Sequence, residues 1–394
     1  MRRFALVLAL CLVFSSAALA GDTEDALDAV LRRYQTLGAC VAVFQNGEVT
    51  YTHCYGTRRI GGDAVTPDTV FQVGSISKMV AGIGLMQLVE ERELSLDADL
   101  GDLLGFPVRH PAFADTPVTL RQVMTHTAAL RDSGDYQLAL NGSPKPLSDL
   151  FGRRVSFAFF PDWEPGARRL YSNFGGGLAG SLIEALSGMN VDAYMKARVF
   201  DPLGITAAYQ CALLPQDVPV AAMYHMPQRR LGKDPRDEAE ADEACDPQRH
   251  YWLTAGKLLI SAPDLAKLGI ALCDGGVCGN ARILKESTVA EMLTRQDFRG
   301  SVTCESGNGL YLNIITDDVT EGRTLYGHGG KAYGMLCAVY FDPASRTGVV
   351  MLTNGCQNRS VHNNVGMLTR QVITLCYERL IDPAHTVEDP FAVE

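Results

Sequence analysis

The chain has 394 residues, of which 47% are hydrophobic and 20% are charged. Its 45 acidic side chains outnumber its 35 basic ones, giving a formal net charge of −10 at pH 7. Such a surface repels a phosphate backbone and no basic stripe offsets it locally, so the sequence argues against nucleic-acid binding. The length suits one large globular unit or two closely joined ones.

Residues 1–20, MRRFALVLALCLVFSSAALA, have the pattern of a secretory signal peptide. Two arginines precede an apolar run that is short for a membrane span, and small residues stand at Ala18 and Ala20. Cys11 follows Leu10 inside the apolar run, which argues against lipidation. We therefore expect cleavage after Ala20, which removes Arg2 and Arg3 and lowers the net charge from −10 to −12. The expected product is secreted or periplasmic, with no stable membrane span.

Cleavage would leave ten of the 11 cysteines. An even number in an exported chain favours disulfides, and we predict the pairs Cys40–Cys54 and Cys273–Cys278, the second across the turn CDGGVC. The chain has neither a C-x-x-C pair nor an H-E-x-x-H motif, so we predict no metal site. The sequence does not decide the remaining disulfide connectivity or the oligomeric state.

The mature chain opens with a pattern for a helix followed by a β-hairpin. Apolar residues at helical spacing predict an amphipathic helix over 23–37. The stretch CVAVFQNGEVTYTHCYG, residues 40–56, then reads as two strands around Asn46-Gly47. A three-residue loop would pair Gln45 with Val49 and place Cys40 opposite Cys54.

The middle of the chain is predicted to be mostly helical. Residues 75–92 are apolar on nearly every side, which is typical of a helix buried in the middle of a domain. Further helix patterns follow over 95–247, separated by Pro, Gly and Asp. The polar, cysteine-bearing stretch 205–250 looks like a long surface excursion.

After residue 250 the sequence returns to strands. Capped helices are predicted at 261–272 and 285–293, strands at 309–316, 335–342 and 347–354, and a last amphipathic helix over 360–380. We predict an α+β fold in which residues 21–72 and 250–383 form an antiparallel sheet flanked by helices. A mostly helical domain, residues 73–249, is inserted, the active site lies between the two parts, and 384–394 form a tail.

The stretch FQVGSISKMVAG, residues 71–82, places Ser75 and Lys78 in the first turn of the buried helix. At this spacing the lysine amine can reach the serine hydroxyl, whereas Ser77 and Lys78, as direct neighbours, do not face each other. The helix start favours negative charge on Ser75, and burial favours a neutral amine that can accept a proton. The S-x-x-K pattern also arises about once by chance in a chain this long, so a chance pair stays open.

Two further elements carry candidate side chains. In EPGARRLYSNFGGGLAG, residues 164–180, Tyr171 can relay a proton and Asn173 can hold a substrate amide or orient the lysine. Alternatively, Tyr171 is a core aromatic and Asn173 a helix cap. In YGHGGKAYG, residues 326–334, a Gly-Gly pair can let substrate approach the backbone, and a backbone N–H there can complete an oxyanion hole. Alternatively, the stretch is an ordinary glycine hairpin turn with His328 beside it.

The three elements together, Ser75-x-x-Lys78, Tyr171-x-Asn173 and His328-x-Gly330, resemble a family of serine hydrolases. It comprises relatives of class C β-lactamases and DD-peptidases (penicillin-binding proteins), with their esterases and D-aminopeptidases. Flanking segments such as DTVFQVGSISKMVAGIGLMQLVEE and VTLRQVMTHTAAL extend the likeness over about residues 25–380. The resemblance implies a β-lactamase/transpeptidase-like fold and no metal or organic cofactor.

The resemblance also implies roles for individual residues. Ser75 would form the acyl-enzyme, with Lys78 and Tyr171 sharing general base and acid work. The N–H groups of Ser75 and Lys331 would bind the oxyanion. The substrate contacts would come from Asn173, His328, Gly330 and Lys331.

One position departs from the β-lactamases of this family, because their third motif begins with lysine and this chain has His328. A mostly neutral imidazole suits a β-lactam carboxylate poorly, although Lys331 could supply a charge. Relatives with histidine at this position are often esterases or D-amino-acid-specific peptidases, so the resemblance implies an exported serine hydrolase that cleaves an ester or a D-amino-acid-containing peptide. The alternatives are a class C-like β-lactamase and a catalytically silent relative that binds peptidoglycan fragments.

Other catalytic readings have less support in the sequence. Gly175, Gly177 and Gly180 satisfy G-x-G-x-x-G, but no clear buried strand precedes them, so we assign them to helix packing. There is no G-x-S-x-G elbow for an α/β-hydrolase triad. We expect His126 to be a structural, hydrogen-bonded histidine.

Overall fold

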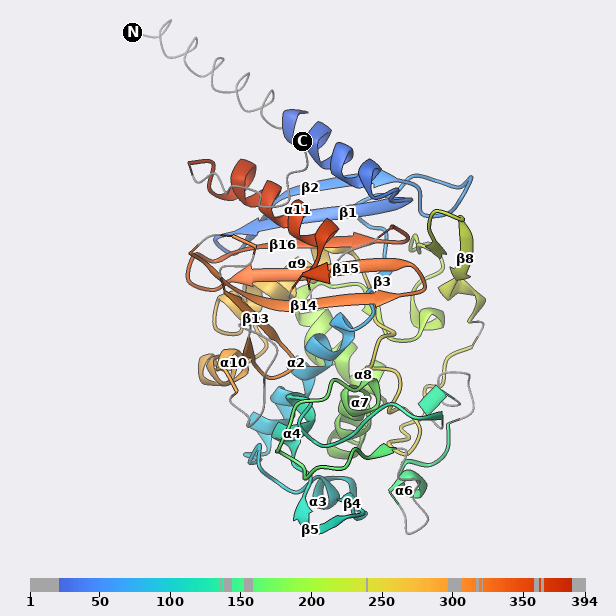
Figure 1. Cartoon of the computed structure of the whole chain (residues 1–394), viewed down its shortest axis with the longest axis vertical. Coiled ribbons are helices and arrows are strands. Elements are labelled where there is room, and N and C mark those ends of the chain that lie inside the picture. Colours follow the sequence, from blue (N-terminus) through green and yellow to red (C-terminus); the bar gives the residue numbers. More distant parts are fainter. Residues whose placement is uncertain are drawn as a thin grey trace, which may run out of the picture.

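A computed structural model describes most of the chain (Figure 1). The described residues are 21–134, 136–137, 144–151, 159–238, 240–296, 307–316, 319–320, 322–357, 361–362 and 365–384. The predicted signal peptide, Cys304 and residues 385–394 of the predicted tail lie outside these ranges. No helix in the described part is long and apolar enough to cross a membrane.

A seven-stranded antiparallel sheet joins the two ends of the chain (Figure 1). Its strand order is β12-β13-β14-β15-β16-β1-β2. The N-terminal strands are β1 (Gly38–Gln45) and β2 (Glu48–Gly56). The C-terminal ones are β12 (Gly307–Asn308), β13 (Asn313–Thr316), β14 (Thr324–Ala332), β15 (Met335–Asp342) and β16 (Thr347–Thr353). The sheet places β1 beside β16, as expected when the two ends of the chain share one sheet.

The first hairpin has the predicted Cys40–Cys54 register but reaches it differently. Gln45 pairs with Glu48, not with Val49, so the loop has two residues, Asn46 and Gly47, both with positive φ. A bulge between Val43 and Phe44 then shifts the register, because it adds one residue to β2. Cys40 therefore faces Cys54, and their Sγ atoms lie 3.1 Å apart as free thiols.

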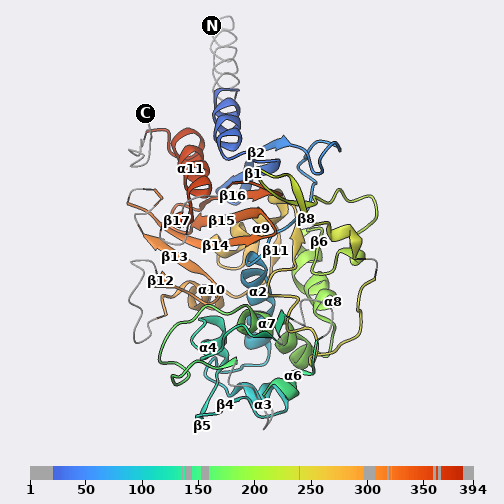
Figure 2. The same cartoon turned by 45° about the vertical axis from the view of Figure 1, so that its right-hand side comes forward.

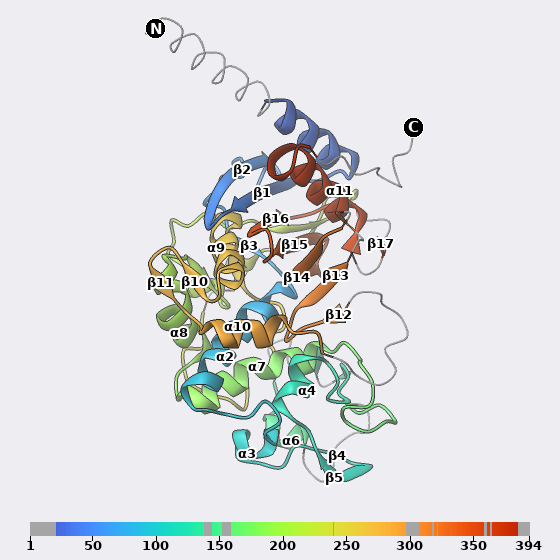
Figure 3. The ribbon, with the colours of Figure 1, turned by 90° about the vertical axis from the view of Figure 1, so that its left-hand side faces the viewer.

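Helices cover both faces of the sheet, and in Figure 3 α11 (Met367–Cys376) lies on one side and α9 (Ala262–Cys273) on the other. The helix over residues 21–33 shares the α11 face, where Leu27 and Leu31 pack with Leu368 and Val372. Ser261 caps α9 by accepting a hydrogen bond from Asp264 N, as predicted. Each face of the sheet thus has its own apolar core.

The predicted buried helix is α2 (Ile76–Glu91), whose residues Ile76 to Val89 are all buried. It packs against α7 (Asn173–Ser187) below the sheet (Figure 2). A Cβ at Gly176 would clash with the side chain of Lys78, and one at Gly177 with Tyr251 O. The glycine run of α7 therefore allows close helix packing, as the sequence suggested.

The remaining elements are short. The helices are α3 (Leu100–Leu104), α4 (Leu120–Met124), α6 (Leu147–Leu150), α8 (Val191–Met195) and α10 (Glu286–Leu293). The short strands are β3 (Phe71–Gln72), β4 (Arg109–His110), β5 (Phe113–Pro117), β6 (Ala207–Ala208), β7 (Met223–His225), β8 (Arg230–Lys233), β9 (Leu259–Ile260), β10 (Val277–Cys278), β11 (Ala281–Arg282), β17 (Val361–His362) and β18 (Val365–Gly366). One-turn helices of 3₁₀ or π type lie at Lys196–Phe200, Asp201–Leu203, Cys211–Leu213, Pro235–Asp237 and Tyr377–Ile381.

Candidate active site

Ser75 and Lys78 lie at the start of α2, directly after a left-handed turn at Gly74 (φ +56°). Lys78 is fully buried and its Nζ has three oxygen neighbours. It lies 3.2 Å from Ser75 Oγ, 2.9 Å from Asn173 Oδ1 and 2.5 Å from Ala255 O. Because a buried amine is costly unless its polar hydrogens are paired, this arrangement fixes Lys78 against the serine hydroxyl.

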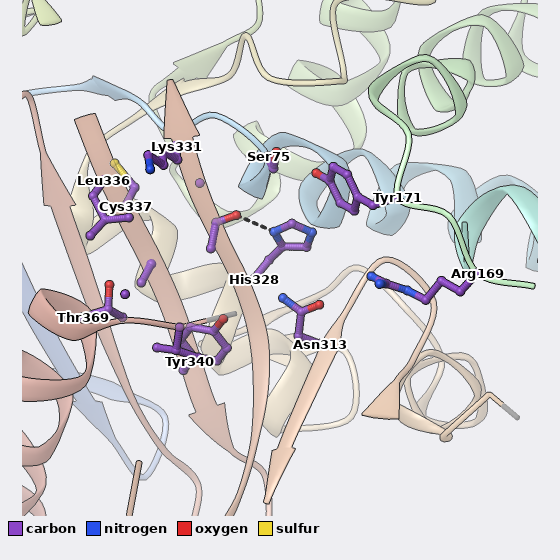
Figure 4. Close-up of a pocket in the computed structure, with 15 residues that line it drawn as sticks. Ser75, Arg169, Tyr171, Asn313, His328, Lys331, Leu336, Cys337, Tyr340 and Thr369 are labelled. Carbon is purple, nitrogen blue, oxygen red and sulfur yellow. Dashed lines mark hydrogen bonds between the residues drawn. The ribbon is translucent and has the colours of Figure 1, made fainter. Parts of the chain in front are cut away.

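The second predicted element supplies Tyr171 and Asn173 at the N-terminus of α7. Ser172, not Asn173, caps this helix by accepting a hydrogen bond from Gly175 N. Asn173 is therefore free to contact Lys78, and Tyr171 is 38% exposed rather than a core aromatic. The Tyr171 ring centroid lies 5.0 Å from Lys78 Nζ, and Figure 4 shows its hydroxyl pointing toward Ser75.

The third predicted element is part of a strand. His328, Gly330 and Lys331 belong to β14, and the turn begins only at Tyr333 and Gly334. A Cβ on Gly330 would clash with Val73 O and lie 3.2 Å from Ser75 N, while a Cβ on Gly74 would lie 3.0 Å from Lys331 N. The backbone of β14 thus approaches the Ser75 turn so closely that both positions need glycine.

These residues share one cavity. A pocket of about 300 Å³ is lined by Ser75, Tyr171, His328, Gly330 and Lys331. Lys78 and Asn173 lie behind it, joined to Ser75 through Nζ. The three predicted elements, far apart in sequence, therefore meet around Ser75.

The structure also brings Asp132 to the site, a residue that the sequence did not single out. Its Oδ1 accepts hydrogen bonds from Ser172 Oγ (3.1 Å) and Phe174 N (2.9 Å), and its Oδ2 accepts one from Asn173 Nδ2 (2.8 Å). Asp132 thereby orients the Asn173 amide so that its Oδ1 faces Lys78. No local pattern marks Asp132, because the contact joins residues 41 apart in the chain.

His126 forms hydrogen bonds with the backbone on both sides of Tyr171. Its carbonyl oxygen accepts a hydrogen bond from Leu170 N (2.8 Å), and Ser172 N donates to its Nδ1 at 3.4 Å. The imidazole also packs against the Tyr171 ring with centroids 4.4 Å apart. The residue is thus the hydrogen-bonded structural histidine that the sequence suggested, in a left-handed conformation (φ 58°), and it fixes Tyr171 in place.

Both histidines near the site are held neutral. Burial lowers the pKa of His328 to about 4. Burial also lowers the pKa of His126 well below its usual value, with Arg169 as the next cause. His328 Nδ1 lies 2.6 Å from Gly329 O, which can only accept, so Nδ1 carries the proton and Nε2 is an acceptor.

Comparison with known proteins identifies the family. The profile of the Beta-lactamase family matches residues 23–370. The chain belongs to this family. Penicillin-binding protein 4 of Amycolatopsis lactamdurans is 29% identical over 340 residues, covering 84% of each chain. Esterase EstB of Burkholderia gladioli is 28% identical over 214 residues, covering 48% of this chain and 51% of the esterase.

A solved structure supports the same assignment at the level of the fold. D-amino acid amidase from Ochrobactrum anthropi SV3, complexed with L-phenylalanine, superposes with a TM-score of 0.68 at 21% identity and covers 92% of this chain and 97% of that one. This β-lactamase-family chain therefore has the predicted α+β, β-lactamase/transpeptidase-like fold. It is a member of a family of serine hydrolases, as the motifs suggested.

Several lining residues of this β-lactamase-family pocket were not predicted, among them one arginine and one asparagine. Arg169 and Asn313 line it together with Ser75, and Arg169 stands two residues before Tyr171 in the second element. Within the described ranges, no three His, Cys, Asp or Glu side chains gather as metal ligands would.

Proposed function

We propose that this protein is an exported serine hydrolase that forms an acyl-enzyme on Ser75 and cleaves an ester or a D-amino-acid-containing peptide. The observation that carries the proposal is the buried Lys78 Nζ, 3.2 Å from Ser75 Oγ, with carbonyl oxygens as its two other neighbours. A neutral amine placed there donates its two N–H bonds to those carbonyl oxygens. Its lone pair then faces the serine hydroxyl and can take its proton.

In acylation, Ser75 Oγ attacks the substrate carbonyl carbon while its proton passes to Lys78. Tyr171 lies against Lys78 Nζ and points toward Ser75, so it can pass that proton to the departing atom. Asn173, oriented by Asp132, holds the Lys78 amine in position through its Oδ1. Water then enters where the leaving group was and releases the acyl group by the reverse proton path.

The oxyanion is proposed to lie between the N–H groups of Ser75 and Lys331. The close approach of β14 to the Ser75 turn supports this, because only glycine fits at positions 74 and 330. Two backbone donors fixed in this way stabilise charge that develops in the transition state and need little reorganisation.

The substrate preference rests on His328. A neutral imidazole whose Nε2 accepts hydrogen bonds offers no charge for a carboxylate. This favours an ester, or a D-peptide without a free carboxylate beside the scissile bond, over a β-lactam. The specific observation that favours the β-lactamase alternative is Lys331, which is exposed and lines the same pocket.

Export and the domain division belong to the proposal as well. A signal peptide over residues 1–20 would take the chain to an oxidising compartment, where Cys40 and Cys54, facing each other across the hairpin, would form a disulfide. Cys273, at the end of α9, and Cys278, on β10, are the second proposed pair. Residues 73–249 form the proposed inserted domain.

A substrate panel tests the proposal. Short-chain p-nitrophenyl esters, nitrocefin and a D-Ala-D-Ala peptide are compared for wild type, Ser75→Ala and Ser77→Ala. We expect ester or peptide hydrolysis that Ser75→Ala abolishes and Ser77→Ala retains. A larger kcat/KM for nitrocefin than for every ester and peptide would instead favour the β-lactamase alternative. Inertness toward the whole panel would favour the silent binder.

A further inference from the structure

The pocket at Ser75 extends beyond the proposed catalytic residues. Its about 300 Å³ are also lined by Leu336, Ala338 and Tyr340 of β15 and by Val365 and Thr369 near the start of α11. Figure 4 shows Tyr340 and Thr369 on the other side of β14 from Ser75 and Tyr171. We call this far part, lined by those five residues, the distal chamber.

The missing side chain of Gly329 leaves the way into the distal chamber open. Side chains alternate along β14, so His328 and Gly330 face Ser75 while Gly329 and Lys331 face the α11 side. Gly329 pairs with Ala338, which belongs to the core on the α11 face. A Cβ on Gly329 would meet only Cys337 O and Tyr340 Oη, both at 3.8 Å. The backbone there does not need glycine, and a larger side chain would project toward Tyr340 and take up space in the pocket.

The surfaces of the distal chamber suit an apolar, uncharged occupant. Leu336, Ala338 and Val365 present carbon atoms, Thr369 adds a small uncharged side chain, and the Tyr340 hydroxyl is already hydrogen-bonded to Asn313. Among the described residues that line the whole pocket, none carries a carboxylate, and Arg169 and Lys331 supply its cations. An ammonium group is therefore disfavoured.

The proton path indicates which part of a substrate reaches the chamber. Tyr171 is proposed to deliver a proton to the departing atom, so the leaving group must lie beside it. Tyr171, Arg169 and His328 line the same pocket as Ser75, and Gly329 lines it too, on the strand between them and the distal chamber. We propose that the distal chamber binds an apolar leaving group, the alcohol part of an ester, with Gly329 as the residue that sets its size. This inference rests on the proposed hydrolysis at Ser75.

Two ester series test the inference on the mature protein. One keeps the acetyl group and lengthens the alcohol from methyl to hexyl, and the other keeps ethanol and lengthens the acyl chain, with kcat/KM measured in a pH-stat. Burial of each added methylene in the chamber should raise kcat/KM about fourfold, so the step from ethyl to pentyl acetate should give about 60-fold. Gly329→Val should flatten the alcohol series and keep the slope of the acyl series.

Further variants separate blockage from damage to the fold. Gly329→Ala should reduce the alcohol slope partly, and Ala338→Val should reduce it from the other wall of the chamber. Gly134→Val is the matched control, because a Cβ there meets nothing within 4 Å and Gly134 lies outside the lining of the pocket. Thermal unfolding and fluorophosphonate labelling of Ser75 show whether each variant is folded and reactive.

The outcomes distinguish a failure of the chamber assignment from a failure of the proposed hydrolysis at Ser75. An alcohol series that is flat in wild type, or that keeps its slope in both Gly329→Ala and Ala338→Val, overturns the chamber assignment and leaves hydrolysis at Ser75 intact. A steep acyl series that Gly329→Val flattens would assign the chamber to the acyl group instead, against the inference. Hydrolysis that persists in Ser75→Ala would overturn the proposed function itself.

Discussion

The two faces of β14 differ sharply at adjacent glycines. On the Ser75 face, a Cβ at Gly330 would clash with Val73 O, and the strand lies against the start of α2. On the α11 face, a Cβ at Gly329 would make only ordinary contacts at 3.8 Å. One strand thus presents a tightly packed face toward the proposed nucleophile and an open face toward the distal chamber.

The same contrast holds for the side chains on the two faces. Lys78, Asn173 and Asp132 form a continuous hydrogen-bonded chain behind Ser75, and each polar group has a fixed partner. The distal chamber is lined by Leu336, Ala338 and Val365 with the hydroxyl-bearing Tyr340 and Thr369, and the exposed Lys331 lines the same pocket. Substitutions on the first face should therefore change rates for every substrate, whereas those on the second should change the choice among substrates.

Among variants that keep Ser75, the largest effect is expected for Lys78→Met, which keeps the bulk of the side chain and removes the amine. Loss of the general base should lower kcat about 10³-fold to 10⁴-fold for the best ester. Steady-state kinetics measures this, and thermal unfolding serves as the control for folding. A loss of less than tenfold in a folded variant would contradict the role of Lys78.

Gly330→Ala should have the next largest effect and tests the comparison of the two glycines directly. The added Cβ pushes β14 away from the Ser75 turn and weakens the oxyanion site, which should lower kcat about 10²-fold to 10³-fold. Gly329→Ala, one residue away, should lose less than tenfold on ethyl acetate. Equal losses in both variants, by kcat measurement, would show that the two faces do not differ as described.

Asp132→Asn should have a moderate effect. In this variant an NH2 group takes the place of one carboxylate oxygen, and it cannot accept the hydrogen bond that Asn173 Nδ2 donates. Asn173 therefore loses one fixed hydrogen bond, and kcat should fall about tenfold. Asp149, an exposed acid on α6, provides the matched control Asp149→Asn. If both variants retain the wild-type kcat, Asp132 has no part in positioning Asn173.

The smallest effect concerns the pH dependence of stability. The pKa of His328 is about 4 in the folded chain, below the free value of 6.5, so the unfolded chain takes up a proton first. The free energy of unfolding should therefore fall as the pH falls from about 6.5 to 4. In His328→Gln this contribution vanishes, while that of His126 remains.

Thermal unfolding across this pH range measures the His328 contribution. The Tm of wild type should fall more steeply toward pH 4 than that of His328→Gln. Parallel profiles would mean that His328 has a similar pKa in the folded and unfolded chain. Lys78 and Arg169, the basic side chains that act on His328, are present in both proteins.

The sequence predicted the parts of the site that local patterns encode. The spacing of Ser75 and Lys78 places them together at the start of one helix. In the same way, the spacing within one hairpin places Cys40 opposite Cys54. Asp132 could not be predicted, because its carboxylate meets Asn173 only when the segment that follows α4 folds onto the N-terminus of α7. The hairpin loop was predicted one residue too long, since a bulge inside β2 gives the same register for the cysteines. The difference between Gly329 and Gly330 was equally hidden, because it depends on what packs on each face of β14.

Labelling of the nucleophile tests the central claim most directly. The protein is treated with a fluorophosphonate, digested and analysed by peptide mass spectrometry, with Ser75→Ala and Ser77→Ala in parallel. The account predicts one adduct, on the peptide that contains Ser75, present in wild type and Ser77→Ala and absent from Ser75→Ala. An adduct on another residue, together with ester hydrolysis that survives Ser75→Ala, would contradict it.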